Sequence, residues 1–209
     1  MRPIRIALTK GRLEKSTIAL FKKMGLDCTE LENKGRRLIL PIPGTPFEVV
    51  LAKAADVITY IEHGVCDVGV VGKDTIMEYG GSFFEIADLG IGRCRFALAC
   101  KKGEDFYSGY AEKTIATKYP NVSRQFFEKK GMDVRIVKIE GSVELAPLLG
   151  LSDAIVDIVE TGTTLRENGL AVIEDVAQVT ARVIVNTVSM KLSKVEIEKL
   201  IADLERVLP

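Results

Sequence analysis

The segment 153–164 limits the possible folds of this chain more than any other. It reads Asp-Ala-Ile-Val-Asp-Ile-Val-Glu-Thr-Gly-Thr-Thr, and residues 165–170 then restart in a pattern that predicts a short helix. A short apolar run that ends in a carboxylate and breaks into a glycine turn before a helix is typical of α/β proteins. In such proteins the loop after the strand lies at the carboxyl edge of a sheet, where ligands bind.

The same order of residues builds a cradle for a phosphate monoester. Backbone N–H groups and the positive end of a helix dipole face an anion at such a turn. Gly162 allows close approach of the backbone, and Thr161, Thr163 and Thr164 add hydroxyl donors. Asp157 at the strand end is placed to accept hydrogen bonds from sugar hydroxyls, which suggests a ribose 5-phosphate group. An ordinary junction whose threonines cap the helix explains the same residues, because neither a Walker A loop nor Gly-x-Gly-x-x-Gly is present.

Composition excludes several classes of partner. The net charge is zero and there is no tryptophan, and the pI is about 6.6. We therefore expect no nucleic acid and no membrane among the partners. The four cysteines lack C-x-x-C spacing, and the single histidine argues against a structural zinc site. Reduced thiols and a first stretch that is neither a signal peptide nor a membrane span predict a cytoplasmic protein.

Hydrophobic patterning predicts strands that alternate with helices along the chain. Strands are expected at residues 4–8, 37–41, 47–51, 67–71, 83–89, 94–100, 113–117, 134–139, 153–159, 170–179 and 182–188. Helices are expected at residues 13–24, 53–63, 75–79, 119–130, 141–149, 165–170 and 193–207. Ser193 and Glu196 match a capping box at the start of the last helix. The alternation predicts an α/β protein with largely parallel sheets.

A second strand–helix–strand series begins near residue 94. We therefore expect two α/β lobes joined by crossover strands, with a central cleft as the site. Residues 1–92 and 184–209 would form one lobe, and residues 93–183 the lobe that carries the phosphate loop. Besides that loop, three further loops follow strand ends: Lys10-Gly11-Arg12, Gly72-Lys73-Asp74 and Glu140-Gly141-Ser142.

Five separated motifs, taken together, carry a family resemblance. They are Thr9–Leu13, Asp56–Asp74, Ala116–Asn121, Lys138–Pro147 and Gly150–Thr164. In this order the set resembles ATP phosphoribosyltransferase, the enzyme that opens histidine biosynthesis. The resemblance spans nearly the whole chain and implies two α/β lobes of the periplasmic-binding-protein type (type II).

The resemblance also implies a reaction. The family joins N1 of ATP to C1 of 5-phosphoribosyl 1-pyrophosphate (PRPP) and releases pyrophosphate. Because adenine N1 is a weak nucleophile, alignment and leaving-group stabilisation should supply most of the acceleration. We expect Mg²⁺ to arrive with the substrate phosphates, and we expect no covalent nucleophile.

The chain ends directly after the last predicted helix, without the regulatory domain of the family's long form. It therefore resembles the short form. That form implies at least a homodimer, which works with a separate regulatory subunit similar to histidyl-tRNA synthetase in a hetero-octamer.

The resemblance assigns the residues 161–164 to the 5-phosphate of PRPP. Asp157 would engage the ribose hydroxyls or the Mg²⁺ attached to them, with Asp153 and Glu140 as further candidates. Asp153 can equally be explained as a residue that starts the strand.

Basic residues at other strand ends are candidates for ATP or pyrophosphate. Two positive charges at a helix N-terminus disfavour the helix, which supports a functional reason for the pair that flanks Gly11, although a solvated helix start is the alternative. Of Arg36 and Arg37, one matches a basic family residue that is expected to reach an active site, either its own or a neighbouring subunit's. An exposed strand start is the competing explanation. The candidates are Lys10, Gly11, Arg12, Arg36, Arg37, Lys53 and Lys73.

Lys53 departs from the family pattern, which has arginine at the matching position. Lysine keeps the charge but loses the bidentate fork. If this position holds the leaving pyrophosphate, we expect weaker turnover or a greater dependence on the partner subunit. His63 lies beside the helix-ending Gly64 and is expected to be a helix-terminal residue and not a catalytic base.

Two other classes of function fit part of the pattern. A non-catalytic protein that binds small anions can use the same two-lobed scaffold, because fold alone does not imply catalysis. A nucleobase-salvage phosphoribosyltransferase is the second alternative. Its best-known loops place two adjacent carboxylates before the Thr-Gly turn, whereas Val156 precedes Asp157 here.

Overall fold

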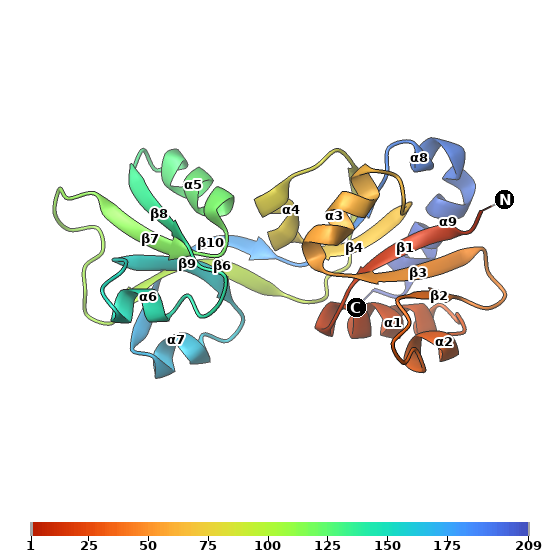
Figure 1. The fold of residues 1–209 in the computed structure, drawn as a ribbon, viewed down its shortest axis with the longest axis horizontal. Helices are drawn as coiled ribbons and strands as arrows, with labels where there is room; N and C mark the ends of the chain where they lie inside the picture. Colours follow the sequence, from red (N-terminus) through yellow and green to blue (C-terminus); the bar gives the residue numbers. More distant parts are fainter. Residues whose placement is uncertain (1, 209) are drawn as a thin grey trace. The chain divides into compact units, whose positions relative to one another are not determined.

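The computed structural model describes residues 2–208, and the chain divides into two compact units. The first unit comprises Met1–Gly92 and Thr180–Pro209, and the second comprises Arg93–Val179 (Figure 1). The terminal residues 1 and 209 lie outside the described part. The chain re-enters the first unit at Thr180 and not at residue 184, because β11 (Ala181–Val185) pairs with two strands of the first sheet.

The first unit is built on a six-stranded sheet of order β2-β3-β1-β4-β11-β5. β1 (Ile4–Thr9), at its centre, runs parallel to β3 (Phe47–Ala52) and β4 (Val68–Gly72). The outer strands β2 (Ile39–Pro41) and β5 (Phe84–Asp88) and the inserted β11 are all antiparallel to their neighbours.

Helices cover both faces of the first sheet because its central strands β1 and β4 are apolar on both sides. Alternate residues of β1 divide between the two cores: Ile6 and Leu8 belong to one cluster and Ala7 to the other. The first core receives α1 (Arg12–Lys23), α2 (Thr29–Glu32) and α9 (Lys194–Arg206). The opposite core receives α3 (Ala54–Glu62) and α4 (Lys73–Tyr79), which lie together above the sheet in Figure 1.

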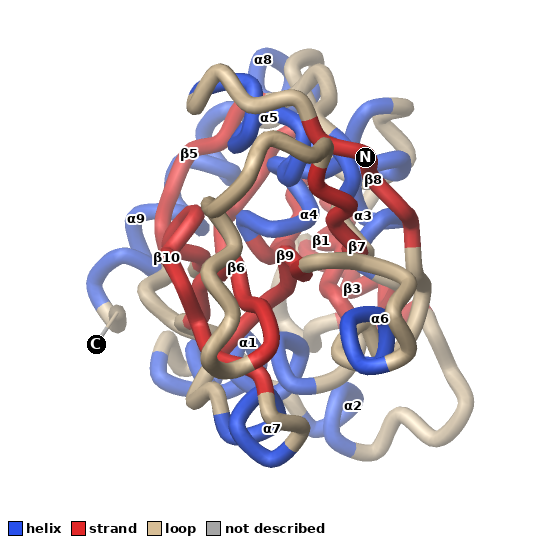
Figure 2. Tube along the Cα trace, turned by 90° about the vertical axis from the view of Figure 1, so that its left-hand side faces the viewer, coloured by secondary structure: helices blue, strands red, loops and turns tan. Residues whose placement is uncertain are grey.

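The second unit is built on a five-stranded sheet of order β10-β6-β9-β7-β8, which can be followed across Figure 2. Its strands are β6 (Cys94–Lys101), β7 (Lys113–Thr117), β8 (Val134–Lys138), β9 (Ala154–Val159) and β10 (Leu170–Val179). β7 runs parallel to β8 and β9, whereas β6 is antiparallel to both of its neighbours.

Helices also lie on both faces of the second sheet. In Figures 1 and 2, α5 (Pro120–Lys129) lies on one side, and α6 (Leu145–Leu148) and α7 (Thr163–Glu167) lie on the other. Leu165 of α7 is buried in one cluster with Ile155 and Val159 of β9. The face of β9 that carries these two residues is therefore the face toward α7.

The α/β class is confirmed, but the prediction of largely parallel sheets is wrong. Local patterning reports whether a segment is extended and buried, and it does not report strand direction. β6 is the strand by which the chain enters the second unit, and it lies between β10 and β9. Both of its pairings are antiparallel, so the second sheet contains parallel and antiparallel strand pairs.

The chain leaves β11 at Val185, not at residue 188 as predicted. Asn186 turns the chain there, because its Oδ1 accepts the backbone N–H groups of Val188 at 3.0 Å and Ser189 at 2.9 Å. Its Nδ2 donates to the Ile61 carbonyl at 2.7 Å. The turn opens α8 (Ser189–Leu192), a helix that the sequence pattern did not predict.

Ser193 precedes α9, but the predicted capping box with Glu196 is wrong. The Ser193 side chain makes no capping hydrogen bond. The reason is that Ser193 also ends α8, where its backbone N–H donates to the Ser189 carbonyl at 2.9 Å. A residue shared by two abutting helices does not have the extended conformation of an N-cap.

The remaining differences concern element ends and very short helices. α6 covers Leu145–Leu148 and not 141–149, β2 begins at Ile39, and α7 begins at Thr163 instead of residue 165. α2 was not predicted, because four residues are too few to show a helical period. No helix within residues 2–208 is both long enough and apolar enough to cross a membrane.

Candidate active site

In the second unit, the residues that follow several strands share one edge of the sheet. β7, β8 and β9 are parallel, so the residues that follow them share the carboxyl edge. Lys118, Glu140 and the 161–164 loop follow these three strands. β6 runs the other way and brings Arg95 to the same edge, opposite Val159. The sequence pattern did not predict this position of Arg95, because it depends on the antiparallel register.

The 161–164 loop turns at Gly162, whose φ of 71° and ψ of 10° lie in the left-handed region. Glycine adopts this conformation without the penalty that a side chain brings. The hydroxyls of Thr161 and Thr163 lie 3.1 Å apart, and the Thr163 N–H points at the Thr161 hydroxyl at 3.4 Å. α7 is only five residues long. Its dipole is therefore weaker than expected, and an anion at this loop would be bound mainly through N–H and hydroxyl donors.

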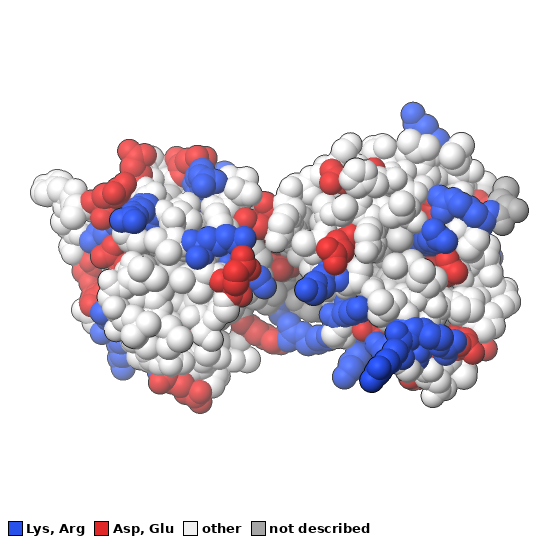
Figure 3. Space-filling model, in the orientation of Figure 1, with Lys and Arg blue, Asp and Glu red and all other residues white. Residues whose placement is uncertain are grey.

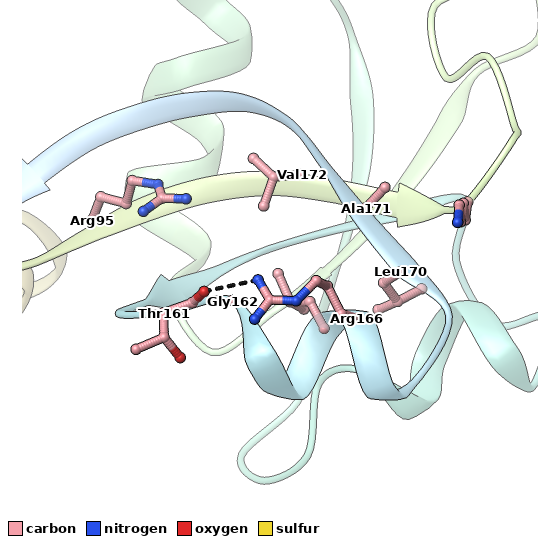
Figure 4. A pocket seen from close by; sticks show the side chains of 9 residues that line it. Arg95, Thr161, Gly162, Arg166, Leu170, Ala171 and Val172 are labelled. Carbon is pink, nitrogen blue, oxygen red and sulfur yellow. Dashed lines mark hydrogen bonds between the residues drawn. The ribbon is translucent and has the colours of Figure 1, made fainter.

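Arg166 braces this loop from within α7. Its Nη1 donates to the Thr161 carbonyl at 3.0 Å, and its Nη2 donates to the Thr163 hydroxyl oxygen at 3.0 Å. Figure 4 shows the guanidinium turned back toward the loop, with the bond to Thr161 drawn as a dashed line. Arg166 was not among the residues predicted from the sequence, although its position three residues after Thr163 places both on one helix face.

A pocket of about 450 Å³ lies beside the loop. Its walls combine three cationic side chains, the turn itself and apolar residues of α7 and β10 (Figure 4). Arg95 in this lining is held by Asp175, with Nε and Oδ1 2.6 Å apart. The lining consists of Arg95, Lys102, Thr161, Gly162, Leu165, Arg166, Leu170, Ala171 and Val172.

Asp157 lies two residues before the end of β9 and is partly buried. It shares its face of the strand with Val159, so it faces the side of α6 and α7. Burial raises the pKa of Asp157 to about 6, and the nearby Glu144 adds to the rise. The N–H of Ile158 and the charge of Lys118 oppose it. A carboxylate that is short of hydrogen-bond donors in this way can accept the hydroxyls of a sugar.

The other two candidate carboxylates do not join Asp157. Asp153 lies at the opposite, amino end of β9, where its Oδ2 accepts the Thr114 N–H at 2.6 Å. It has the geometry of a residue that starts the strand. Glu140 lies two residues after the end of β8 and pairs with Lys138 at 2.7 Å, which holds the pKa of Glu140 below its usual range. Since β7 separates β8 from β9, two strand spacings of about 5 Å keep Glu140 away from β9.

In the first unit, the structure brings three of the expected basic loops together. The carboxyl ends of β1, β3 and β4 are adjacent, with Thr9 opposite Ala52 and Leu8 opposite Val70. The residues that directly follow these three strands are Lys10, Lys53 and Lys73. Gly11 turns the first loop with a φ of 101°, a left-handed value that suits glycine.

The availability of these charges differs. Lys10 and Lys53 are exposed, and within residues 2–208 neither forms an ion pair. Lys73 is paired with Glu85 at 2.6 Å, which partly neutralises it. Lys and Arg side chains also gather over the part of the first unit that carries α1 and α2, as comparison of Figure 3 with Figure 1 shows.

Arg36 and Arg37 are distinguished by their contacts. Arg37 is held by its own loop, because it donates to Glu30 at 2.6 Å and to the carbonyls of Asn33 and Lys34 at 3.1 and 3.3 Å. Arg36 is exposed and makes no hydrogen bond or ion pair with any residue in the range 2–208. Of the two, Arg36 has the guanidinium that is open to a ligand.

A buried carboxylate that was not predicted from the sequence joins two of these basic segments. Glu14 is only 5% exposed. It accepts the Gly11 N–H at 3.2 Å and forms an ion pair with Lys34. Glu14 therefore connects the turn after β1 with the loop that carries Arg36.

His63 and the cysteines have positions that structure alone explains. His63 ends α3 and is exposed. The four cysteines are free thiols, and burial raises the pKa of Cys66 to about 11, so that this thiol stays protonated at neutral pH. No group of three or more metal-ligating side chains converges among residues 2–208.

Comparison with known proteins identifies the family. The family model of ATP phosphoribosyltransferase (HisG) matches residues 53–206. The ATP phosphoribosyltransferase of Clostridium kluyveri is 58% identical over 200 residues, which cover 96% of this chain and 91% of that protein. The one from Clostridium botulinum is 54% identical over 210 residues, which cover 100% and 99%.

Solved structures agree in fold. The ATP phosphoribosyl transferase (HisG:HisZ) complex from Thermotoga maritima matches with a TM-score of 0.82 at 35% identity, covering 98% of both chains. The periplasmic aliphatic sulphonate binding protein SsuA from Escherichia coli matches with a TM-score of 0.62 at 12% identity, covering 99% of this chain and 72% of that one. The second match shows the fold alone, which is the two-lobed type II fold of periplasmic binding proteins. The chain therefore belongs to the ATP phosphoribosyltransferase family.

Proposed function

We propose that the 161–164 loop holds the 5-phosphate of PRPP and that Asp157 engages its ribose hydroxyls. The observation that carries this assignment is the loop itself. Its left-handed Gly162 stands between two threonine hydroxyls at the end of a buried strand, and Arg166 adds a positive charge beside them. A dianionic phosphate fits such a set of N–H, hydroxyl and guanidinium donors.

Family membership gives the reaction. The enzyme is a pentosyltransferase that joins N1 of ATP to C1 of PRPP and releases pyrophosphate, the first step of histidine biosynthesis. The nucleophile is weak, and the ribosyl group becomes cationic as pyrophosphate leaves. The enzyme must therefore align the two substrates and stabilise the leaving group.

Asp157 suits the ribose end of this reaction. With a pKa of about 6 it is mostly ionised at pH 7.5. The ionised carboxylate can accept hydrogen bonds from both ribose hydroxyls, which fixes the ring while C1 reacts. Asp153 is not part of this proposal, because its carboxylate is bonded at the far end of the strand.

The basic edge of the first unit suits pyrophosphate or the triphosphate of ATP. Lys10, Arg12, Arg36 and Lys53 are exposed there, and the turn at Gly11 presents backbone to a ligand. Lys73 is a weaker candidate, since a phosphate would have to compete with Glu85. We propose Mg²⁺ as the metal, carried in by the substrate phosphates, where it would neutralise the charge of the departing pyrophosphate.

A partner and a location complete the proposal. The solved relative from Thermotoga maritima is a HisG:HisZ complex, and this chain matches its sequence at 35% identity over 98% of both chains. We propose that the present chain likewise forms a dimer that works with a separate regulatory subunit similar to histidyl-tRNA synthetase, in a hetero-octamer. ATP and PRPP are made in the cytoplasm, where we place the enzyme.

The first test measures pyrophosphate release from PRPP with Mg²⁺, with and without ATP. We expect release only with ATP, together with an ultraviolet shift of adenine that reports substitution at N1. If the chain alone releases no pyrophosphate, the assay is repeated with the regulatory subunit. Binding of PRPP without release in both assays would favour the non-catalytic anion-binding alternative, and release with a free nucleobase would favour a salvage enzyme.

The second test addresses the loop. Thr163→Val removes one hydroxyl at constant shape, and we expect the KM for PRPP to rise about tenfold, as for a lost bond to a charged group. The KM for ATP should stay unchanged. Thr59→Val on α3 is the matched control, because its hydroxyl bonds only within its own helix. An unchanged KM for PRPP in Thr163→Val would remove the loop from the site.

A further inference from the structure

The guanidinium of the exposed Arg166 donates hydrogen bonds to the backbone and to a side chain of the 161–164 loop. One nitrogen contacts the Thr161 carbonyl and another the Thr163 hydroxyl oxygen, each at 3.0 Å. An exposed arginine usually points into water, since holding a long side chain costs conformational entropy. Two donors that converge on the two sides of one glycine turn indicate a role in shaping that turn.

The bond to Thr163 determines where the hydroxyl protons can go. A hydroxyl oxygen has one proton to donate. Because Thr163 Oγ1 accepts from Arg166, its own proton points away from the guanidinium. The Thr161 hydroxyl likewise accepts the Thr163 N–H. One proton can serve the bond between the two hydroxyls, which are 3.1 Å apart, and the other remains for an anion.

The bond to the Thr161 carbonyl orients the next peptide group. In a trans peptide the C=O and the following N–H point in opposite directions. A carbonyl of Thr161 that is held toward Arg166 therefore turns the Gly162 N–H away from Arg166. The same arginine thus directs one backbone donor and one hydroxyl donor of the loop.

Arg166 also carries a charge that no described carboxylate neutralises. Within residues 2–208 it forms no ion pair, and its described bonds are those to the loop. Charge-assisted bonds are stronger than neutral ones. The positive charge strengthens the Thr163 hydroxyl as a donor, because an oxygen that accepts from a cation gives up its own proton more readily in a hydrogen bond.

We propose that Arg166 is a positioning residue that holds the 161–164 loop in the conformation that receives the 5-phosphate of PRPP. This inference rests on the proposed function of the loop. It states that Arg166 acts through the Thr163 hydroxyl and the Thr161 carbonyl by its bidentate geometry, and not by charge alone.

The experiment compares Arg166→Met, Arg166→Lys and the double variant Arg166→Met/Thr163→Val in the full chain, with the regulatory subunit present throughout. We measure kcat, the KM for PRPP and for ATP, and PRPP binding by calorimetry with Mg²⁺. Arg166→Met should raise the KM and the dissociation constant for PRPP about tenfold, as expected for lost charge-assisted bonds. The kcat should fall less than about threefold, and the KM for ATP should not change.

Two results separate geometry from charge and from general destabilisation. Arg166→Lys should stay close to Arg166→Met, because lysine keeps the charge but cannot span both acceptors. The KM for PRPP of the double variant should exceed that of the more impaired single variant by no more than about twofold, since both substitutions disrupt the same interaction between Arg166 and Thr163. Arg124→Met is the control, because that exposed arginine on α5 bonds to Asn121 one turn away. It should leave every constant unchanged.

Several outcomes would overturn the inference. They are full recovery of PRPP binding in Arg166→Lys, additive effects in the double variant, or an equal rise of both KM values. A normal KM in Arg166→Met with a raised one in Thr163→Val sinks only the role of Arg166. Normal PRPP binding in Thr163→Val removes the loop from the site and with it the proposed function of that loop. If Arg166→Met misfolds by circular dichroism, Arg166→Gln gives the same comparison with one donor kept.

Discussion

Asp157 carries the most unusual titration in the described site. Its pKa of about 6 lies above the ordinary value because burial disfavours the charged form. An acid whose pKa rises on folding stabilises the fold only while it is protonated. Below pH about 4 both states hold the proton, and between pH about 4 and 6 the unfolded chain ionises first. Above pH about 6 the destabilisation is constant, at most about 3 kcal/mol.

This cost predicts the behaviour of Asp157→Asn. The variant should be more stable than the parent at pH 7.5, and the difference should vanish toward pH 4, as urea unfolding at both pH values would show. Activity should fall, since asparagine carries no charge to accept the ribose hydroxyls strongly. This is the trade between stability and function expected of an active site.

Glu140→Gln is a control in which the expected change in stability has the opposite sign. Lys138 holds the pKa of Glu140 below its ordinary range, so the parent carboxylate favours folding at neutral pH. This variant should lose stability relative to the parent at pH 7.5 and regain it in acid. A gain in Asp157→Asn that is equal at both pH values would contradict the electrostatic explanation.

At the scale of elements, Glu14 connects α1 to two neighbouring loops. Its carboxylate holds the Gly11 N–H before the helix and the Lys34 amine after α2. The Glu14 side chain is 6% exposed and Lys34 is 36% exposed, whereas both partners of the Lys22–Glu32 pair are about half exposed. A shielded pair is screened less by water and salt.

We therefore expect Lys34→Met to destabilise the chain by about 1–2 kcal/mol, because it leaves a buried carboxylate without its partner. Lys22→Met, the matched control, should change stability by less than about 0.5 kcal/mol. Chemical unfolding with and without 0.5 M salt would measure both. The Lys34 change should also weaken ATP or pyrophosphate binding by loosening the loop that carries Arg36. Equal effects of the two substitutions would rule out a special role for Glu14.

At the scale of the molecule, the two units depend differently on the continuity of the chain. The second sheet and its helices lie within Arg93–Val179. The first sheet needs β11, which is inserted between β4 and β5 and comes from the last part of the chain. α9 then covers the core that this sheet shares with α1.

This asymmetry predicts the result of truncation. A chain that stops at Val179 should lose the first unit, because β5 would have no neighbour and the core under α9 would be open to water. The second unit should keep its fold, and hydrogen exchange should show protected amides in β6 and β9 but not in β1. A fragment of residues 93–179 should give the same protection. Loss of protection in both units would show that neither folds alone.

The sequence by itself determined the local features of this protein. The alternation of strands and helices, the glycine turns at Gly11 and Gly162 and the carboxylate at Asp157 all follow from neighbouring residues, and the family follows from motifs in order. In each case the physics is short-ranged: the residue after a buried strand and a glycine that must turn left are readable from a few positions.

Only the tertiary structure decided which residues meet. Arg95 reaches the edge of the sheet that carries the 161–164 loop, because β6 is antiparallel to β9. Asp153 lies at the opposite end of β9, one strand length away from that loop. Glu14 finds Lys34, twenty residues away, through the packing of a loop on α1. Strand direction, register and long-range ion pairs depend on contacts between distant segments. The sequence pattern therefore predicted local elements and turns, whereas contacts between distant segments determined which residues lie together.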